Sequence, residues 1–235
     1  MSSLREKGER FVELHRGEPF VIPNPWDVGS ALELEKLGFP ALTTTSSGFA
    51  WAIGKRDGQA TVDEVVEHVR AVAAATSVPL AVDLENHHEA IGRVAEAGAV
   101  GASIEDWDGA AIYPLEEAVA RLRVAVDAAR ALPHPFVLVG RAENHIHGID
   151  DLDDTIVRLQ AYEEAGADCL YAPGLRTPEQ VRAVCEAVSK PVNVLLWGDL
   201  TVQSSFDAGA QRVSVGGALA FKARDALVAA ASALR

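Results

Sequence analysis

One pattern recurs along this sequence: a short apolar run bounded by turn-forming residues, followed by a longer segment with apolar residues at helical spacing. The apolar runs predict eight strands, at residues 20–24, 40–46, 79–85, 100–105, 136–142, 168–172, 191–196 and 212–216. The segments that follow them predict helices at residues 27–37, 61–76, 87–97, 114–131, 150–165, 177–188, 200–208 and 218–234. A strand followed by a helix therefore occurs eight times.

Similar short segments recur where a predicted helix gives way to the next strand: LEKLGFPAL, VAEAGAVGAS, YEEAGADCL and SFDAGAQRVS. Each places glycine just after a helix, where a left-handed backbone is needed. Eight such units in 235 residues are typical of an α/β protein of the (β/α)8 TIM barrel type, and we predict a single barrel domain over residues 1–235. An open, doubly wound sheet has the same alternation and is the alternative.

The charge balance excludes some partners. The chain has 34 acidic and 21 basic residues and a net charge of −13, which repels nucleic acid and anionic membranes. The charged N-terminal segment resembles no signal peptide, and no apolar run is long enough to span a membrane. We therefore expect a cytoplasmic protein without nucleic-acid or membrane partners. Cys169 and Cys185 form no CxxC motif and are expected to be ordinary buried thiols.

Two pairs of charged residues come at the ends of predicted strands. Asp83 and Glu85 lie in PLAVDLEN, and Arg141 and Glu143 lie in FVLVGRAEN. Residues two apart in a strand point to the same side, so each pair directs two charges to one place. Because unpaired buried charges are costly, we expect a shared polar ligand or a metal ion there. For the second pair, a purely structural ion pair is the alternative to a base beside a substrate-binding arginine.

A further strand end adds to the acidic group. The sequence SIEDW gives Ser103 and Glu105 on one face and Asp106 on the other. Glu105 is then the third acid at adjacent strand ends. Carboxylates without histidine or cysteine suit Mg²⁺, or alternatively Mn²⁺, held partly through water. The alternative is that these acids cap helices or pair with the arginine.

The segment after the second predicted strand, TTTSSGFAWAIGKRDGQAT, is rich in hydroxyl groups. Thr43, Thr45 and Ser47 alternate on one face, and Gly48 lets the backbone approach a ligand. Hydroxyl and exposed N–H groups suit a carboxylate or a phosphate, although a turn with no ligand is the alternative. A small anionic carboxylate is compatible with the negative net charge, because a bound cation and one arginine reverse the local field.

Other candidates are weaker. His87 and His88 follow the first acidic pair, and His145 and His147 lie in the loop after GRAEN and could reach the site. The SVGGA turn after the last strand could cradle a phosphate at a helix N-terminus. None of the five lysines lies near the C-terminal end of a predicted strand, which argues against a Schiff-base aldolase.

Six motifs, NPWDVGSA, TTSSGFA, VDLEN, SIED, GRAEN and PVNVL, occur in order between about Phe20 and Ala220. Together they resemble the short-chain branch of the isocitrate lyase and phosphoenolpyruvate mutase superfamily. The resemblance implies a (β/α)8 barrel that binds Mg²⁺ and a small 2-oxo or enol carboxylate, and that makes or breaks a bond next to it. It also makes a homo-oligomer the expected state.

The resemblance implies roles for individual residues. Asp83, Glu85 and Asp57 match the acids that hold the metal, partly through water. We expect Arg141, Glu143 and Glu105 to be the catalytic residues, with Arg141 facing the substrate. The expected substrate-binding residues are Thr45, Ser47, Gly48, Phe49, Trp26 and Asn193.

The sequence departs from the superfamily pattern in three places. The acidic motif continues with Asn86, His87 and His88 instead of Gly-Tyr-Gly. The segment after the fourth strand, EDWDGAAIYP, carries neither the cysteine of the lyase lid nor the lysine of the mutase lid. True isocitrate lyase and phosphonate mutase activities are therefore not expected. The chain stops soon after the eighth helix, whereas many members extend further and exchange C-terminal helices, so a helix-swapped dimer is not expected either.

Three hypotheses follow. The leading one is a Mg²⁺-dependent lyase that cleaves or decarboxylates a small 2-hydroxy or 2-oxo (di)carboxylate through an enolate-like intermediate; a mutase or hydrolase of the phosphonate or phosphoenolpyruvate type is an alternative to it. The second is a catalytically silent relative that binds a metabolite such as oxalate or pyruvate. The third is an unrelated phosphate-binding barrel. Candidates for the general acid are Tyr113, His87, His145 and water.

Overall fold

The strands form one parallel sheet. The computed structural model describes residues 3–235, and its strand order is β1-β8-β7-β6-β5-β4-β3-β2. The strands are β1 (Phe20–Val21), β2 (Leu42–Thr43), β3 (Leu80–Asp83), β4 (Gly101–Glu105), β5 (Val137–Arg141), β6 (Cys169–Tyr171), β7 (Val192–Leu195) and β8 (Arg212–Ser214). All eight predicted strands are confirmed, each inside its predicted range.

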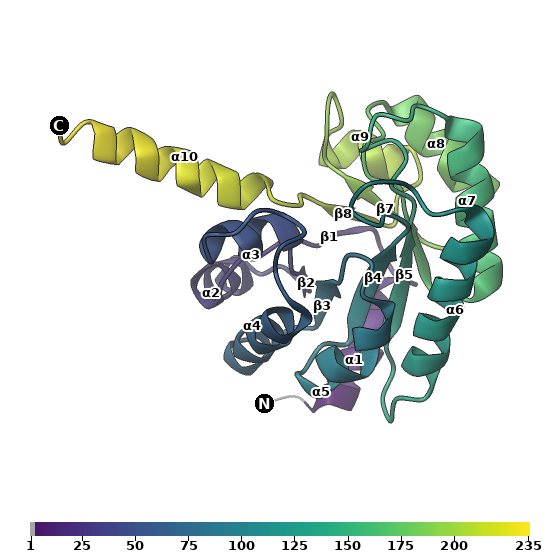
Figure 1. The fold of residues 1–235 in the computed structure, drawn as a ribbon, viewed down its shortest axis with the longest axis horizontal. Coiled ribbons are helices and arrows are strands. Elements are labelled where there is room, and N and C mark those ends of the chain that lie inside the picture. The colour runs from purple at the N-terminus through teal and green to yellow at the C-terminus, as the bar shows by residue number, and fades with distance from the viewer. Residues whose placement is uncertain (1–2) are drawn as a thin grey trace.

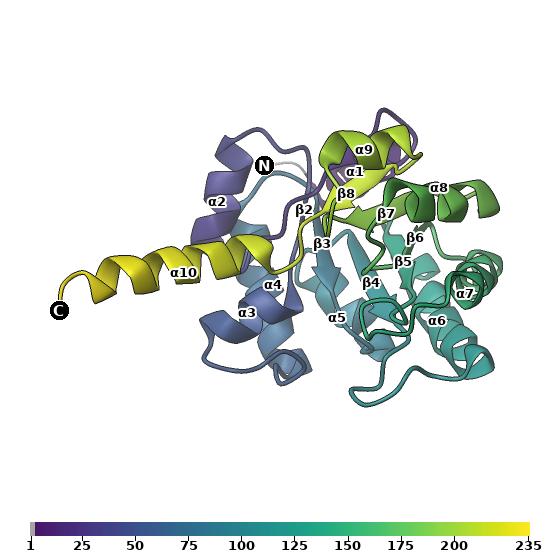
Figure 2. The same cartoon turned by 90° about the horizontal axis from the view of Figure 1, so that it is seen from above.

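The sheet is curled, with helices on its outside (Figures 1 and 2). The two ends of the strand order, β1 and β2, approach each other: Thr43 N donates to Pro23 O at 3.2 Å, and Asn24 Nδ2 donates to Thr44 O at 3.0 Å. A doubly wound sheet reverses its strand order in the middle, so that alternative is wrong. The predicted parallel α/β architecture is confirmed.

All eight predicted helices are present, although the one predicted at residues 87–97 splits in two. Within residues 3–235, no helix is both long enough and apolar enough to cross a membrane. The helices are α1 (Leu4–Leu14), α2 (Val28–Lys36), α3 (Ser46–Ala52), α4 (Val62–Ala75), the 3-10 helix η1 (His88–Ala90), α5 (Ile91–Glu96), α6 (Leu115–Arg130), α7 (Leu152–Ala165), α8 (Pro178–Ala187), α9 (Val202–Asp207) and α10 (Ala218–Ser232).

Two helices, α1 and α3, were not predicted. α1 begins with a capping box, in which Ser3 and Glu6 each accept from the other's backbone N–H. α3 begins at Ser46 because the Thr45 side chain accepts from Gly48 N. The strand predicted for residues 40–46 therefore ends at Thr43, and the remainder of that prediction is wrong. As a result, the serines of TTTSS lie on the first turn of a helix.

Apolar side chains lie on both faces of the sheet. In β5, Val137 and Val139 belong to the cluster inside the curl, while Leu138 belongs to the cluster between sheet and helices. Phe11 of α1 joins the inner cluster and lies against Gly101 at the start of β4. α1 therefore fills the end of the curled sheet at which the strands begin, which leaves the other end for a site.

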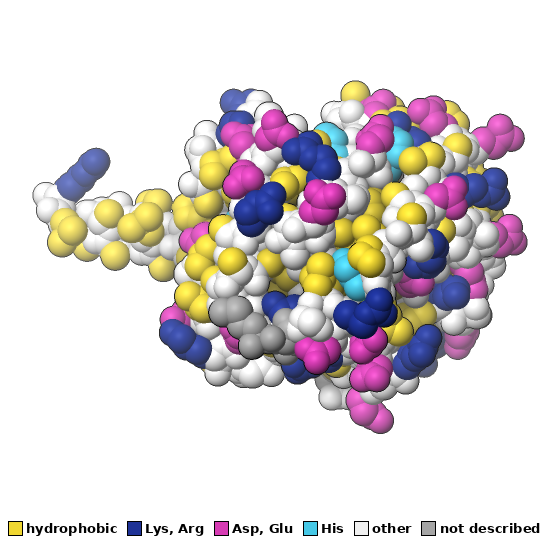
Figure 3. Space-filling view, turned by 90° about the horizontal axis from the view of Figure 1, so that it is seen from below, with side chains coloured by type: hydrophobic (Ala, Val, Ile, Leu, Met, Phe, Trp, Pro, Cys, Tyr) yellow, Lys and Arg dark blue, Asp and Glu magenta, His cyan; other side chains and the backbone are white. Residues whose placement is uncertain are grey.

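α10 leaves the body of the molecule. It projects to one side in both ribbon views, and Figure 3 shows hydrophobic side chains along it. Leu227 is 62% exposed and Val228 is 57% exposed. The first turn of α10 is covered, since Ala220 is buried, whereas Leu227 and Val228 farther along the helix are left uncovered.

Candidate functional site

Two adjoining cavities open where the strands end and the loops to the next helices begin. Their volumes are about 560 and 430 Å³, and Ser46, Asp57, Arg141 and Ile146 line both of them. The predicted site residues that line the larger cavity are Asp57, Glu85, Glu105, Arg141 and Glu143. Those that line the smaller cavity are Thr45, Ser47, Asp57, Asp83, Arg141 and Asn193.

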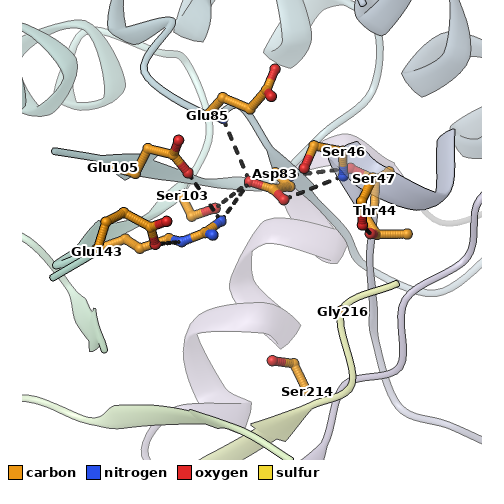
Figure 4. Close-up of polar contacts among 12 residues, drawn as sticks. Thr44, Ser46, Ser47, Asp83, Glu85, Ser103, Glu105, Glu143, Ser214 and Gly216 are labelled. Carbon is orange, nitrogen blue, oxygen red and sulfur yellow. Dashed lines mark hydrogen bonds and ion pairs between the residues drawn. The ribbon is translucent and has the colours of Figure 1, made fainter. Parts of the chain in front are cut away.

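Arg141, at the end of β5, joins three of the acids. Its Nη1 lies 3.1 Å from Asp83 Oδ1 and 3.2 Å from Glu105 Oε2, and its Nε donates to Glu143 Oε1 (Figure 4). The parallel register places Glu105 of β4 directly beside Arg141, so this contact follows from the strand pairing. Nη2 takes no part in these three ion pairs and is the group that can bind a substrate oxygen.

Asp83 connects β3 to its neighbours on both sides. Its Oδ2 accepts from Ser46 N at 3.3 Å, and its Oδ1 accepts from Ser103 Oγ at 3.4 Å (Figure 4). Its own backbone N–H donates to Thr44 Oγ1 at 3.0 Å. Because these contacts come from the ends of β2 and β4, Asp83 lies at the centre of the site.

Burial raises the pKa of three further acids of the site, Glu85, Asp57 and Glu105. Burial, with repulsion from Asp83, raises the pKa of Glu85 to about 7. Burial and the same aspartate raise the pKa of Asp57, and burial raises that of Glu105 despite its contact with Arg141. These carboxyl groups are buried together with too little positive charge to keep them all ionised.

The backbone at Glu85 is unusual. Its φ is +50°, and no other residue except glycine has a positive φ in the described part of the chain. This left-handed conformation carries steric strain for a residue with a Cβ atom. It turns the chain immediately after β3 and keeps the Glu85 side chain at the larger cavity, which that side chain lines.

The residues present fit a hard divalent cation. The available donors are carboxylate oxygens, the type that Mg²⁺ and Mn²⁺ prefer. Across residues 3–235, no three His, Cys, Asp or Glu side chains are already arranged to hold a metal ion directly. That agrees with an ion that keeps several water ligands and contacts one or two carboxylates. Burial, and then repulsion from Asp83, raises the pKa of both Glu85 and Asp57.

The turn at the start of α3 is tightly built around Gly48. A Cβ there would lie 2.6 Å from Thr45 Cγ2 and 3.1 Å from Trp26 Cβ. Neither Trp26 nor Gly48 is among the residues that line the two cavities. Phe49 is also absent from the lining and stacks on His68 with a centroid distance of 4.1 Å. Direct substrate contact by these three residues therefore stays a prediction.

Arg212 and Ser214 also line the smaller cavity, and neither was predicted. Arg212 is buried and donates from Nε to Asn193 Oδ1 at 2.9 Å, and Asn193 Nδ2 donates to Ser214 Oγ at 3.0 Å. The guanidinium also lies 3.1 Å from His15 Nε2. The alternation of polar residues in the RVS segment of β8 was the only sequence signal for this group.

A second buried network supports the loop after β5. Asp106 lies on the face opposite Glu105, as predicted, where it accepts from Tyr162 OH at 2.5 Å and from Arg158 Nη1 at 3.1 Å. Its other oxygen accepts from Glu143 N at 2.8 Å. Asp106 thus fixes the backbone of Glu143 relative to β4.

Backbone N–H groups in the glycine turn after β8 already have a hydrogen-bond partner. The amide groups of Val215 and Gly216 both donate to Asn24 Oδ1 at 2.9 Å. Because these are the groups that a phosphate would need, the structure gives no support to the phosphate-cradle hypothesis.

The candidate proton donors separate into two groups. Tyr113 and His145 do not line either cavity. His87 and His147 both line the larger one, and burial lowers the pKa of His87.

Comparison with known proteins gives a consistent result. A family model described as phosphoenolpyruvate phosphomutase matches residues 11–235. The 2-methylisocitrate lyase of Escherichia coli K12 is 31% identical over 210 residues, which cover 81% of this chain and 70% of that protein. The oxaloacetate decarboxylase of Rhodopseudomonas palustris BisB18 is 33% identical over 171 residues, which cover 66% of this chain and 57% of that protein. A solved structure from Burkholderia cenocepacia J2315, provisionally assigned as a lyase or mutase, is 46% identical, with a TM-score of 0.94 over 97% of this chain and 87% of that chain.

Proposed function

The chain belongs to the phosphoenolpyruvate phosphomutase family, and we propose that it is a Mg²⁺-dependent lyase of small 2-hydroxy or 2-oxo (di)carboxylates. The reaction is C–C cleavage or decarboxylation through an enolate-like intermediate. The lyase and the decarboxylase among its relatives favour this chemistry. We take the whole of residues 1–235 as one (β/α)8 barrel domain with this single site.

The observation that carries the proposal is the excess of acidic residues over arginines around the two cavities. Six acidic residues line the two cavities: Asp57, Asp83, Glu85, Glu105, Asp108 and Glu143. The two guanidinium groups that line these cavities, Arg141 and Arg212, offset only part of this negative charge, so the acids favour a divalent cation as their partner. Asp83, Glu85 and Asp57 would hold it, partly through water.

Side chains of the site would bind the substrate and stabilise the charge that develops on it. A bound Mg²⁺ would polarise the oxygen atoms of the oxo acid as a Lewis acid. Arg141 Nη2 donates to the oxygen that gains negative charge when the C–C bond breaks. Thr45 and Ser47 would present hydroxyl groups to the substrate carboxylate, and the Asn193 amide lines the same cavity.

A catalytically silent binding protein is the second candidate. It is favoured by the short segment after β4, where Trp107 and Ile112 pair in an antiparallel bridge and close a turn without cysteine or lysine. A site without a lid leaves a bound acid accessible to water. Tight, Mg²⁺-dependent oxalate binding without turnover on a panel of hydroxy and oxo acids would favour this candidate.

The test is calorimetry of oxalate binding with and without Mg²⁺, on wild type, Asp83→Ala and Asp63→Ala. Asp63 is a matched control because its side chain is 83% exposed on the surface of α4. We expect Mg²⁺-dependent binding in wild type and Asp63→Ala and its loss in Asp83→Ala. The proposed metal site would be contradicted if oxalate affinity were the same with and without Mg²⁺, or if Asp83→Ala bound oxalate as tightly as wild type.

We also propose a homo-oligomer. The exposed apolar side chains Leu227 and Val228 on α10 support it, since exposed apolar patches often mark surfaces that bind another protein molecule. Light scattering across a range of protein concentrations would detect it, and a monomer at every concentration would contradict it.

A further inference from the structure

The lyase proposed above needs a group that gives a proton to carbon, and the segment after β4 lacks the cysteine and the lysine that could do so. The larger cavity is lined by two histidines, His87 and His147, and histidine is the residue type that most often transfers protons in enzymes. The two differ in how they are held, and that difference points to one of them.

His147 is fixed in three ways. Its ring stacks on Trp107, with centroids 3.6 Å apart and ring planes 13° from parallel. Its Nε2 lies 3.3 Å from Glu143 Oε2, and its backbone N–H donates to Glu143 O at 3.2 Å. The side chain is still 30% exposed at the cavity. It is therefore rigid and accessible, as a proton-transfer group has to be.

Glu143 links this histidine to the arginine. One of its oxygens accepts from Arg141 Nε and the other faces His147 Nε2, while its backbone is held by Asp106. A carboxylate oxygen attracts an N–H group, so Glu143 Oε2 facing Nε2 at 3.3 Å favours the neutral imidazole tautomer that carries its proton there. Nδ1 is then the nitrogen that can face the substrate, in the arrangement of a base oriented by an acid.

We propose that His147 is the catalytic residue that transfers a proton to and from the substrate carbon through Nδ1, oriented by Glu143 and Trp107. This inference rests on the proposed function. After C–C cleavage, the enolate oxygen returns its electron pair to carbon, and that carbon takes the proton from Nδ1 of the imidazolium. In reverse, Nδ1 removes a proton from the methyl group of an oxo acid such as pyruvate, and the C–H electron pair forms the enolate.

The reverse step gives an assay that needs no knowledge of the natural substrate. In D₂O with Mg²⁺, proton NMR follows the exchange of pyruvate methyl hydrogens for deuterium. Oxalate binding by calorimetry serves as the companion measurement, because an enolate mimic binds without any proton transfer. The variants are His147→Asn, His87→Asn as the rival donor, and His134→Asn as a control in the turn before β5, where strands begin.

We expect His147→Asn to slow exchange by about 100-fold or more, which is the usual contribution of a general acid or base. Its oxalate affinity should stay within about threefold of wild type, a difference below 1 kcal/mol. Exchange at the wild-type rate in His147→Asn, or its loss in His87→Asn alone, would overturn the assignment. Wild type that binds oxalate but does not exchange pyruvate would overturn it while leaving the metal site standing. If wild type neither bound oxalate nor exchanged pyruvate hydrogens, the proposed function itself would be contradicted.

A second readout requires neither metal nor turnover. The long-range proton–nitrogen NMR spectrum of the metal-free protein, assigned with His147→Asn, reports which ring nitrogen carries the proton. The geometry predicts the Nε2–H tautomer for neutral His147. The Nδ1–H tautomer would overturn the proposed orientation, because Glu143 would then not hold the ring.

Discussion

Arg212 donates from Nε to Asn193 Oδ1 at 2.9 Å, and this contact decides which way the Asn193 amide points. Because Oδ1 is held, the amide nitrogen turns toward Ser214 Oγ, 3.0 Å away. Beneath them, burial together with Arg212 lowers the pKa of His15 to about 3, so this histidine is neutral and can accept from the guanidinium. A residue that follows the first helix thereby orients a side chain in the substrate cavity.

Replacement of Arg212 by methionine should weaken oxalate binding about tenfold, since the Asn193 amide loses its fixed direction. The free energy of unfolding should fall by about 1.5–3 kcal/mol, the usual contribution of a buried hydrogen bond to a charged group. Calorimetry and urea unfolding measure the two effects. Arg130→Met is the control: it breaks the partly exposed ion pair with Asp168, 2.7 Å apart, and should leave oxalate binding unchanged. Wild-type oxalate affinity in Arg212→Met would show that the orientation of Asn193 does not matter.

Tyr162→Phe should lower the free energy of unfolding by about 1–3 kcal/mol, because Asp106 loses its 2.5 Å phenol donor and stays buried. Urea unfolding followed by fluorescence gives the value. Tyr113→Phe provides the matched comparison, since its ring lies 4.5 Å from Arg121 Cζ and that contact does not use the hydroxyl. An equal loss in the two variants would mean that the network around Asp106 adds no stability.

The raised pKa of Glu85 predicts that the stability of the metal-free protein depends on pH. Its pKa rises from 4.5 to about 7 on folding, so between these values the folded state keeps a proton that the unfolded state has lost. Stability from this group is therefore fully present below pH 4.5 and is lost as pH rises through 7. Urea unfolding between pH 5 and 8 should show a decline in wild type that is smaller in Glu85→Gln. The same slope in both proteins would locate the titration elsewhere.

Gly48→Ala should destabilise the turn before α3, because a Cβ would approach Thr45 Cγ2 to 2.6 Å and two further side chains to 3.1 Å. We expect a lower melting temperature, corresponding to about 1–3 kcal/mol, and weaker oxalate binding. Gly92→Ala in α5 is the control, since nothing lies within 4 Å of its Cβ, and it should be neutral or stabilising by up to about 1 kcal/mol. If both alanines behave alike, close packing at Gly48 is not a constraint.

The sequence was most informative where a functional group lies within a strand. Asp83 and Arg141 were predicted to share a site from their place at strand ends alone, because the parallel register brings such positions together. The same reasoning placed Asp106 on the opposite face from Glu105, and the structure confirms this. Local alternation and strand order were sufficient for these residues.

Contacts between distant segments could not be predicted. His15 and Arg212 are 197 positions apart, and only the folded sheet brings α1 beneath β8. The start of α3 was missed because TTTSS has the alternation of a strand, while the Thr45 cap that ends the strand depends on a single hydrogen bond to Gly48 N. The stacking of His147 on Trp107 likewise depends on two loops whose paths no local pattern describes.

The left-handed backbone of Glu85 has a consequence for how this protein changes over time. Glycine adopts a φ of +50° without a steric penalty, whereas glutamate at such a position gives up about 1–3 kcal/mol. Random drift under selection for stability alone would replace this residue, since the substitution would raise the melting temperature. Glu85 therefore gives up stability in this chain that a glycine at the same position would not, while it supplies a carboxyl group to the larger cavity.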